Sequence, residues 1–271
     1  FRIEREAREA GQVILDVEQV SAENDKGLPA LRNISFQVRA GEILGLAGVA
    51  GNGQRELAEV ITGLRKCTTG QVRVRDQVVS NQSARTAIDR GVAHIPQDRK
   101  EVGTAPNLSI ANNLILKNYR KPPIARRMSV DYTAAHSHAQ QLKEEYDIMA
   151  PSVDTSVRYL SGGNLQRVIL AREISAGPEL MIAMQPTRGL DVGAIEGVHR
   201  LLLELRSSGA AILLVSEELD EITSLSDRIA VIYEGNIVGQ VSGEVDDEGR
   251  ERIGLMMTGQ AAQEQRQQAE E

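Results

Sequence analysis

Apolar and polar residues alternate in short runs from Val13 onward, and this pattern predicts strands in the first part of the chain. The alternation is clear over residues 34–38, and the continuous apolar run over 43–46 predicts a buried strand. Beyond a glycine-rich stretch, apolar residues recur at helical spacing from 57 to 64. A strand, a glycine loop and a helix therefore follow one another. A hairpin turn is predicted near residues 76–77.

The segment from about 100 to 160 has a different pattern, with few strand signals. Two helix-like stretches, 109–117 and 131–147, stand on either side of the breaker Pro122-Pro123. We therefore predict a helical subdomain at about 100–160, inserted between the strand-rich parts of the chain.

Helices and strands alternate again after this insertion. Such alternation is typical of a mostly parallel sheet covered by helices, so the predicted fold class is α/β. The predicted helices span 164–175, 192–207 and 217–225, and the predicted strands span 179–184, 211–215 and 228–233.

The two ends of the chain lack the pattern of a packed core. Residues 1–11 are charged, and we expect an inter-domain linker there, ahead of a domain at 12–258. Residues 259–271 are rich in Gln, Glu and Ala, and we expect a disordered tail. Because the chain begins with Phe1 and not with Met, we expect a fragment or a processed product.

Composition narrows the class of function. The net charge of −7 over 271 residues argues against a nucleic-acid partner, because such proteins carry a basic surface. The single cysteine, Cys67, excludes an internal disulfide and is typical of a reducing compartment. No stretch approaches the roughly 20 apolar residues that cross a bilayer, and no signal peptide is visible. We therefore expect a soluble, cytoplasmic chain.

Residues 48–55 are the first candidate site. They keep the glycine frame of a P-loop, G-x-x-x-x-G-K-[S/T], in which backbone N–H groups surround a phosphate. The Lys and Ser/Thr positions hold Gln54 and Arg55 instead. For the glycines alone, a tight strand-to-helix turn without a ligand is the alternative. The candidate phosphate-binding residues are Gly48, Val49, Ala50, Gly51, Asn52, Gly53, Gln54 and Arg55.

Residues 160–167, Leu-Ser-Gly-Gly-Asn-Leu-Gln-Arg, are the second candidate site. They place a hydroxyl and two glycine amides at the start of a helix, where an anion binds favourably. An ordinary serine N-cap is the alternative. The motif follows the glycine loop by about a hundred residues, and together the two resemble the P-loop and signature motif of ATP-binding cassette (ABC) ATPases. The candidate residues are Ser161, Gly162, Gly163 and Asn164.

The resemblance covers about residues 12–258 and implies an ABC-type P-loop NTPase core, with an antiparallel β subdomain and an inserted helical subdomain. Residues 180–191 resemble the Walker B strand and D-loop, where the D-loop Asp191 is intact. Met184 replaces the Asp that holds Mg²⁺ in P-loop enzymes. Gln185 replaces the Glu that the family uses as a base, and an amide cannot accept a proton as a carboxylate does.

Further family positions follow from the same resemblance. Glu217 stands where the family has its switch histidine, and a carboxylate there would repel the γ-phosphate. Gln97 is the amide of the Q-loop. No aromatic residue for stacking on adenine lies between Val20 and Leu31. Arg55 adds positive charge near the expected magnesium position. We therefore predict that Gln185 and Glu217 mark a degenerate catalytic centre, with no metal ligand at this P-loop.

In this family two cassettes enclose two nucleotides, and each ATP contacts the P-loop of one cassette and the signature of the other. The resemblance thus implies that this chain completes the ATP site of a partner cassette, with Mg²⁺ mainly at that site. The motif combination is similar to the second cassette of tandem-cassette importer ATPases for simple sugars and nucleosides, leaning toward nucleosides. The implied partners are a first cassette, transmembrane permease subunits and, indirectly, an extracytoplasmic solute-binding protein, at the cytoplasmic face of the plasma membrane.

Two other functions stay open. The chain could be a non-catalytic nucleotide-binding and docking module of the same transporter, which differs only in whether its P-loop contributes hydrolysis. A cassette protein of DNA repair or translation is disfavoured by the acidic composition and by the lack of a long coiled-coil insertion.

Overall fold

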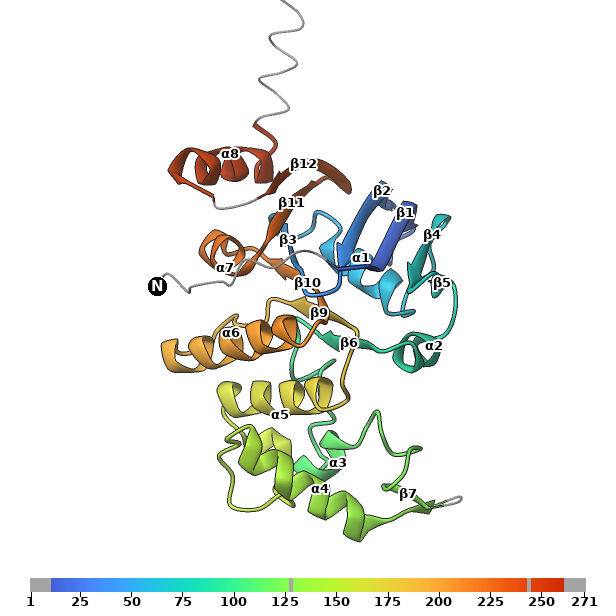
Figure 1. The fold of residues 1–271 in the computed structure, drawn as a ribbon, viewed down its shortest axis with the longest axis vertical. Helices are drawn as coiled ribbons and strands as arrows, with labels where there is room; N and C mark the ends of the chain where they lie inside the picture. Colours follow the sequence, from blue (N-terminus) through green and yellow to red (C-terminus); the bar gives the residue numbers. More distant parts are fainter. Residues whose placement is uncertain (1–10, 127–128, 243–244, 261–271) are drawn as a thin grey trace, which may run out of the picture. The chain divides into compact units, whose positions relative to one another are not determined.

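The computed structural model describes residues 11–126, 129–242 and 245–260, which form two compact units (Figure 1). The first unit holds the described residues up to Val92, together with Glu179–Gln185 and those from Leu203 onward. The second holds Ala93–Pro178 and Pro186–Leu202 in their described parts. Residues 1–10 of the predicted linker and 261–271 of the predicted tail lie outside the described residues.

The first unit contains a four-stranded antiparallel sheet. Its strands are β1 (Val13–Glu23), β2 (Pro29–Arg39), β4 (Thr69–Val74) and β5 (Gln77–Val78), in the order β2-β1-β4-β5. Val17 pairs with Phe36 on one side and with Val72 on the other, so three buried side chains share one face. The turn between β4 and β5 has positive φ at Arg75 (46°) and Asp76 (62°), as in a type I′ hairpin. The predicted hairpin at 76–77 is confirmed.

A second sheet has six strands in the order β12-β11-β3-β10-β9-β6. They are β3 (Ile43–Ala47), β6 (Val92–Ile95), β9 (Leu180–Met184), β10 (Ala211–Ser216), β11 (Arg228–Tyr233) and β12 (Asn236–Ser242). The strands β3, β9, β10 and β11 are parallel, and β12 is antiparallel to β11. Every residue of β3, β9 and β10 is buried, as in parallel strands covered on both faces. The predicted α/β fold with a parallel sheet is confirmed.

The register of these parallel strands positions the candidate site. Val215 of β10 pairs with Met184 of β9, and Ser216 pairs with Ala47 of β3. The carboxyl ends of the three strands therefore lie level at one edge of the sheet. The residues that follow them are brought together there, which is the usual place for ligands in open α/β sheets.

Helices of the first unit follow its strands. α1 (Gln54–Ile61) begins directly after the glycine loop and buries Leu57, Val60 and Ile61, as the helical spacing predicts. The other helices that lie entirely in this unit are α2 (Ala84–Asp89), α7 (Leu219–Leu225) and α8 (Asp247–Met257). α6 (Val192–Ser207) has the bounds that the sequence predicts.

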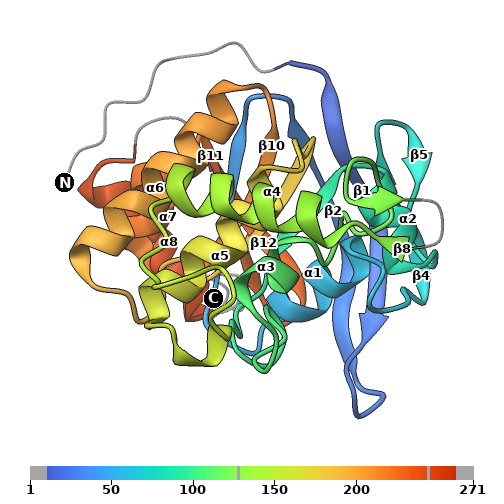
Figure 2. The ribbon, with the colours of Figure 1, turned by 90° about the horizontal axis from the view of Figure 1, so that it is seen from below.

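The second unit is mainly helical, with α3 (Ile110–Leu114), α4 (Tyr132–Glu145), the short 3₁₀ helix η1 (Val157–Tyr159) and α5 (Gly162–Ile174). A core that includes Leu114, Leu142 and Val168 joins α3, α4 and α5, which run from green to yellow in Figure 2. Ser109, Asp131 and Ser161 cap the starts of these three helices by accepting a backbone N–H with their side chains.

The structure of the predicted insertion adds two details. It contains a small antiparallel hairpin, β7 (Ala125–Arg126) with β8 (Ser129–Val130), which is too short to leave a strand pattern in the sequence. The helix predicted at 109–117 spans only α3, and turns follow it. Beyond α3, the ammonium group of Lys117 contacts the buried carboxylate of Glu173, a tertiary contact that the local pattern does not contain. None of the helices within the described residues combines the length and apolar character of a bilayer crossing.

Candidate functional site

The glycine loop at residues 48–53 connects β3 to α1 in a conformation that two of its glycines make possible. Gly53 has a φ of 104°, and a Cβ atom there would lie 2.6 Å from the carbonyl oxygen of Ala30. A Cβ atom on Gly48 would lie 2.7 Å from the carbonyl oxygen of Ile232. Both distances are far shorter than a carbon–oxygen contact allows. The loop is therefore packed against two neighbouring strands, β2 and β11, in a conformation that requires glycine at these two positions.

Asn52 attaches this loop to the turn between β11 and β12. Its side-chain oxygen accepts the backbone N–H of Glu234 at 2.8 Å, and its backbone oxygen accepts that of Gly235 at 3.1 Å. Its side-chain nitrogen donates to the carbonyl of Val49 at 2.9 Å. The side chain of Asn52 is thus used for the structure of the loop.

Gln54, at the position of the P-loop lysine, folds back onto the loop. Its side-chain oxygen accepts the backbone N–H of Asn52 at 3.1 Å, and its side-chain nitrogen donates to the carbonyl of Val49 at 2.9 Å. The residue is only 7% exposed. One of the backbone N–H groups that a phosphate would need is therefore bonded within the protein.

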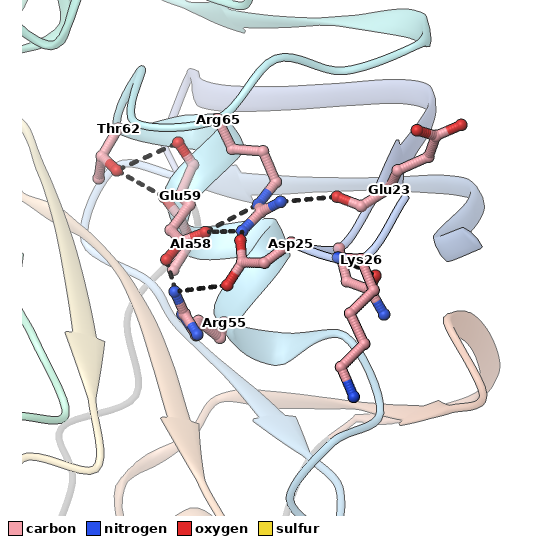
Figure 3. A network of polar contacts seen from close by, with 9 residues as sticks. Glu23, Asp25, Lys26, Arg55, Ala58, Glu59, Thr62 and Arg65 are labelled. Atoms are coloured by element: carbon pink, nitrogen blue, oxygen red, sulfur yellow. Dashed lines mark hydrogen bonds and ion pairs between the residues drawn. The ribbon is translucent and has the colours of Figure 1, made fainter. Parts of the chain in front are cut away.

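Arg55 points toward a network of ion pairs (Figure 3). Its guanidinium lies 3.3 Å from Asp25 and 2.7 Å from Glu59, and Arg65 contacts the same two carboxylates. The hydrogen bond and the charge of Arg65 are the main causes that hold the pKa of Asp25 below its usual value. The positive charge of Arg55 is therefore paired with the carboxylates of Asp25 and Glu59.

The network also links two segments that are distant in sequence. Asp25 lies in the turn between β1 and β2, and Arg55 and Glu59 lie on α1. Arg65 donates a further hydrogen bond to the carbonyl of Glu23 at 2.7 Å. The pattern of apolar and polar positions did not predict this cluster, although the charges at 25, 55, 59 and 65 were the available signal.

The two positions predicted as a degenerate catalytic centre lie in contact. Gln185, 7% exposed and with a φ of 46°, follows β9 and donates its backbone N–H to Val215 at 2.8 Å. Its side-chain oxygen accepts the backbone N–H of Glu217 at 3.4 Å, a long hydrogen bond. The amide of Gln185 therefore supports the strand ends. The preceding Met184 is buried at 4% exposure.

Neither of the two positions that hold Mg²⁺ in P-loop enzymes carries an oxygen ligand in this chain. Mg²⁺ takes oxygen ligands in an octahedral arrangement. Met184 offers a thioether, and Arg55 offers a cation that is already paired.

The signature residues lie at the exposed start of α5, in the second unit. The Ser161 hydroxyl oxygen accepts the backbone N–H of Asn164 at 3.3 Å and its side-chain N–H at 3.1 Å. A Cβ atom on Gly163 would lie 4.0 Å from a carboxylate oxygen of Asp191, whose other oxygen accepts the backbone N–H of Ala194 at 2.9 Å. The structure thus places the predicted signature and D-loop residues beside one another.

Next to the signature lies a hollow of about 450 Å³ with a cationic lining. Arg99 donates to the carbonyl of Arg188, and burial lowers the pKa of its guanidinium. Neither of these arginines, nor Lys100, forms an ion pair with a carboxylate of the described chain. The arrangement can attract an anion. The lining residues are Gln97, Asp98, Arg99, Lys100, Gly162, Leu165 and Arg188, which include the predicted Q-loop amide.

A buried carboxylate connects the signature helix to the strand before Gln97. Glu173 is fully buried, and it contacts Lys117, accepts from Arg172 at 2.8 Å and accepts the backbone N–H of His94 at 3.0 Å. Burial opposes ionisation of Glu173, but the attraction of the two cations outweighs it and holds its pKa below the usual value. The sequence pattern did not single out this residue, because nothing local distinguishes Glu173 from the other polar residues of α5.

The chain is similar in sequence to known ATP-binding proteins of importers. The profile of the ABC transporter family matches residues 31–188. A glucose import ATP-binding protein of Haloferax volcanii is 46% identical over 96% of this chain. A nucleoside import ATP-binding protein of Lactococcus lactis and a guanosine import ATP-binding protein of Bacillus subtilis are each 42% identical, over 96% and 97% of it. The chain spans about half the length of these relatives, between 47% and 51%.

Solved structures agree on the fold. A nucleotide-free ATP-binding cassette from an ABC transporter superposes with a TM-score of 0.74 at 21% identity, covering 89% of this chain and 95% of that one. A dimeric cassette in a post-hydrolysis state, bound to ADP and Pi, gives 0.73 at 21% identity, covering 84% and 98%. With a glycine loop after β3 and a signature serine at the start of α5, this chain belongs to the ABC transporter family as an ATP-binding cassette.

Proposed function

We propose that this chain is the second, C-terminal cassette of a tandem-cassette ATPase that couples ATP binding and hydrolysis to import of a nucleoside or a simple sugar. The printed names of its relatives, which include nucleoside, guanosine, glucose and ribose import, support this class of solute. The chain spans about half the length of each of these relatives, and this supports the presence of a second cassette in the same polypeptide. Residues 12–258 would be the cassette, 1–11 the linker from the first cassette, and 259–271 a tail.

In this proposal the chain's own glycine loop hydrolyses ATP weakly or not at all. Gln54 bonds to the loop itself, Arg55 is paired, and Gln185 supports the backbone of Glu217. Deleting a single transition-state donor typically lowers the rate by roughly 10²–10³, and here several are replaced together. Weak ATP binding through the remaining backbone N–H groups is compatible with the loop.

The catalytic contribution would come from the signature. Ser161 is exposed at the start of a 13-residue helix, beside Gly162 and Gly163, whose N–H groups belong to the positive end of the helix dipole. These groups would complete the ATP site of the partner cassette, where Mg²⁺ would bind. Permease subunits, and through them a solute-binding protein, would be the other partners, with the cassettes at the cytoplasmic face of the membrane.

One contrast carries this proposal: the signature hydroxyl is exposed, while the glycine loop is bonded by its own Gln54. The bonding of the glycine loop by Gln54 also favours a second candidate, a non-catalytic nucleotide-binding and docking module of the same transporter, which differs only in that its own glycine loop contributes no hydrolysis. Two variants of the complete transporter test the two candidates. We expect Ser161→Arg to abolish solute-linked ATP turnover and Gln185→Ala to leave it unchanged. Normal turnover with Ser161→Arg would contradict the shared ATP site, and loss of turnover with Gln185→Ala would show that this glycine loop hydrolyses ATP and would contradict the docking module.

A further inference from the structure

We propose that Asn164 is a positioning residue that turns the hydroxyl of Ser161 into an obligatory hydrogen-bond donor. Its side chain would fix the direction of one proton, and that proton would point away from α5 toward the oxyanion that the signature binds. This inference rests on the proposed function of Ser161, which supplies the anion as the phosphate chain of the partner's ATP. It adds a residue to that site and assigns it a role.

The orientation of the Asn164 amide follows from its other contact. The backbone N–H of Met149 lies 2.8 Å from Oδ1 of Asn164. An N–H group can only donate, so the atom facing it must be the amide oxygen. The amide nitrogen therefore faces Ser161, at 3.1 Å from its Oγ. The loop that precedes the signature thus settles which end of the amide meets the serine.

Both acceptor positions of the serine oxygen are then occupied. A hydroxyl oxygen accepts two hydrogen bonds and donates one. Ser161 Oγ accepts the backbone N–H of Asn164 at 3.3 Å and the side-chain N–H of Asn164 at 3.1 Å. The Ser161 proton cannot point at either donor, so it is directed outward. Within the described chain no acceptor lies within hydrogen-bond distance of it, and Ser161 is exposed.

A Ser161 hydroxyl that can only donate a hydrogen bond matches an ionised phosphate, which can only accept one. Phosphate oxygens accept hydrogen bonds and, when ionised, do not donate them. A hydroxyl that can rotate loses part of its affinity for such a group because it also populates orientations in which it accepts. Restricting Ser161 to donation removes those orientations before the nucleotide arrives, which is the kind of preorganisation that stabilises a developing charge.

Another serine of this chain provides the comparison. Ser109 caps α3 and accepts the backbone N–H of Asn112 at 3.2 Å, in the same Ser-x-x-Asn spacing. No side-chain hydrogen bond joins Asn112 to Ser109 in the described structure. The second bond at Ser161 is therefore not a general result of the spacing. It arises because Met149 holds the Asn164 amide in place.

The test is Asn164→Asp in the complete transporter, assayed for solute-stimulated ATP turnover. The new carboxylate keeps an acceptor for Met149 and has nearly the same shape, but it accepts from Ser161 where the amide donated. An acidic residue in the first turn of a helix is favourable, so folding is retained. We expect kcat to fall by roughly 10-fold or more, approaching the fall in Ser161→Ala, which removes a donor of the kind worth about 10²–10³.

A double-mutant cycle separates positioning from added charge. In the Ser161→Ala background, Asn164→Asp should change kcat by less than about twofold, because a residue that acts through Ser161 has nothing left to act on. Asn112→Asp makes the same chemical change at the Ser109 cap and should leave kcat and the melting temperature unchanged.

Each other outcome contradicts the inference in a recognisable way. If Ser161→Ala lowers kcat and Asn164→Asp does not, the positioning role is wrong and the proposed function stands. If the two effects multiply, the carboxylate acts by charge and not through the serine, and the inference is also overturned. If Ser161→Ala itself has no effect, the proposed function and the inference both fail.

Discussion

The side-chain oxygen of Gln54 accepts the backbone N–H of Asn52 at 3.1 Å. The residue at the lysine position of the motif thus engages a loop N–H that would otherwise be available to a phosphate. The side-chain nitrogen of Gln54 donates to the carbonyl of Val49 at 2.9 Å, so both polar atoms of the amide are bonded to the loop. A lysine ammonium has only donors and could make the second bond but not the first. The substitution therefore changes the loop in two ways, by removing a cation and by engaging an N–H.

Restoring the two side chains of the motif should separate binding from hydrolysis. We expect Gln54→Lys combined with Arg55→Ser to raise the affinity for ATP by about tenfold or more. A hydrogen bond to a charged group contributes about 1.5–3 kcal/mol, and about 1.4 kcal/mol is tenfold in affinity. Turnover at this loop should stay absent, because Met184 and Gln185 remain. Calorimetric titration and a phosphate-release assay measure the two quantities.

The matched control for this change is Gln12→Lys combined with Arg55→Ser, which makes the same changes of charge but places the lysine at an exposed position outside the loop. It should leave the affinity for ATP unchanged. An equal gain in the control would mean that the loss of Arg55, and not a lysine in the loop, sets the affinity. Recovered turnover in the double variant would contradict our account of the strand-end residues.

The glycines of the loop offer a pair of substitutions that differ in one respect. Gly53→Ala and Gly51→Ala both place a side chain at positive φ, 104° and 90°. The Gly53 methyl would meet the carbonyl oxygen of Ala30 at 2.6 Å, whereas no atom lies within 4 Å of a Gly51 methyl. Both pay backbone strain of about 1–3 kcal/mol. We expect Gly53→Ala to lower the free energy of unfolding further, as measured by urea denaturation, and equal losses would contradict the packing of this loop on β2.

Glu173→Gln should strongly destabilise the protein. The change keeps the shape of the side chain but leaves Lys117 and Arg172 without their buried counter-charge. Removing one partner of a buried pair costs about 3–5 kcal/mol. Urea denaturation at neutral pH measures this loss. Glu144→Gln, on the exposed face of α4, is the control and should change stability by less than about 0.5 kcal/mol.

The contribution of Glu173 to the free energy of unfolding should also depend on pH and should decrease in acid. Its pKa is lowered in the folded protein, so it binds a proton less readily there than in the unfolded chain. Its contribution is therefore present above its unfolded pKa of about 4.3 and is lost as the pH falls through the folded pKa. The stability difference between the wild type and Glu173→Gln should shrink on acidification. A difference that grows below pH 4 would show that the carboxylate is not ionised in the fold.

Arg55→Ala, in contrast, should have a small effect on stability. The Arg55 and Asp25 side chains are 62% and 63% exposed, and exposed ion pairs contribute about 0–1 kcal/mol. We expect a shift in the melting temperature of a few degrees or less, smaller still at high salt because salt screens the pair. A large loss would indicate that the network of Asp25, Glu59 and Arg65 is cooperative.

The difference between predicted and observed sites has a physical cause. The glycine loop, the signature and the positions after β9 and β10 could be recognised in sequence, because each is a local stretch whose backbone geometry depends on its own residues. The pairing of Arg55 was not visible in the sequence pattern, because its guanidinium contacts Asp25, thirty residues earlier in the chain. The contact from Asn164 to Met149 was equally invisible, since it depends on how the preceding loop packs.

The sequence by itself determined the α/β fold, the order of its strands and helices along the chain, and the residue types available for chemistry. Periodic burial and glycine spacing are local properties, so they survive in the one-dimensional pattern. Only the tertiary structure decided which polar groups remain available. Gln54 is bonded to its own loop, Gln185 supports Glu217, and Ser161 keeps one proton directed outward. A hydrogen bond depends on distances of a few tenths of an ångström between groups that the sequence does not place.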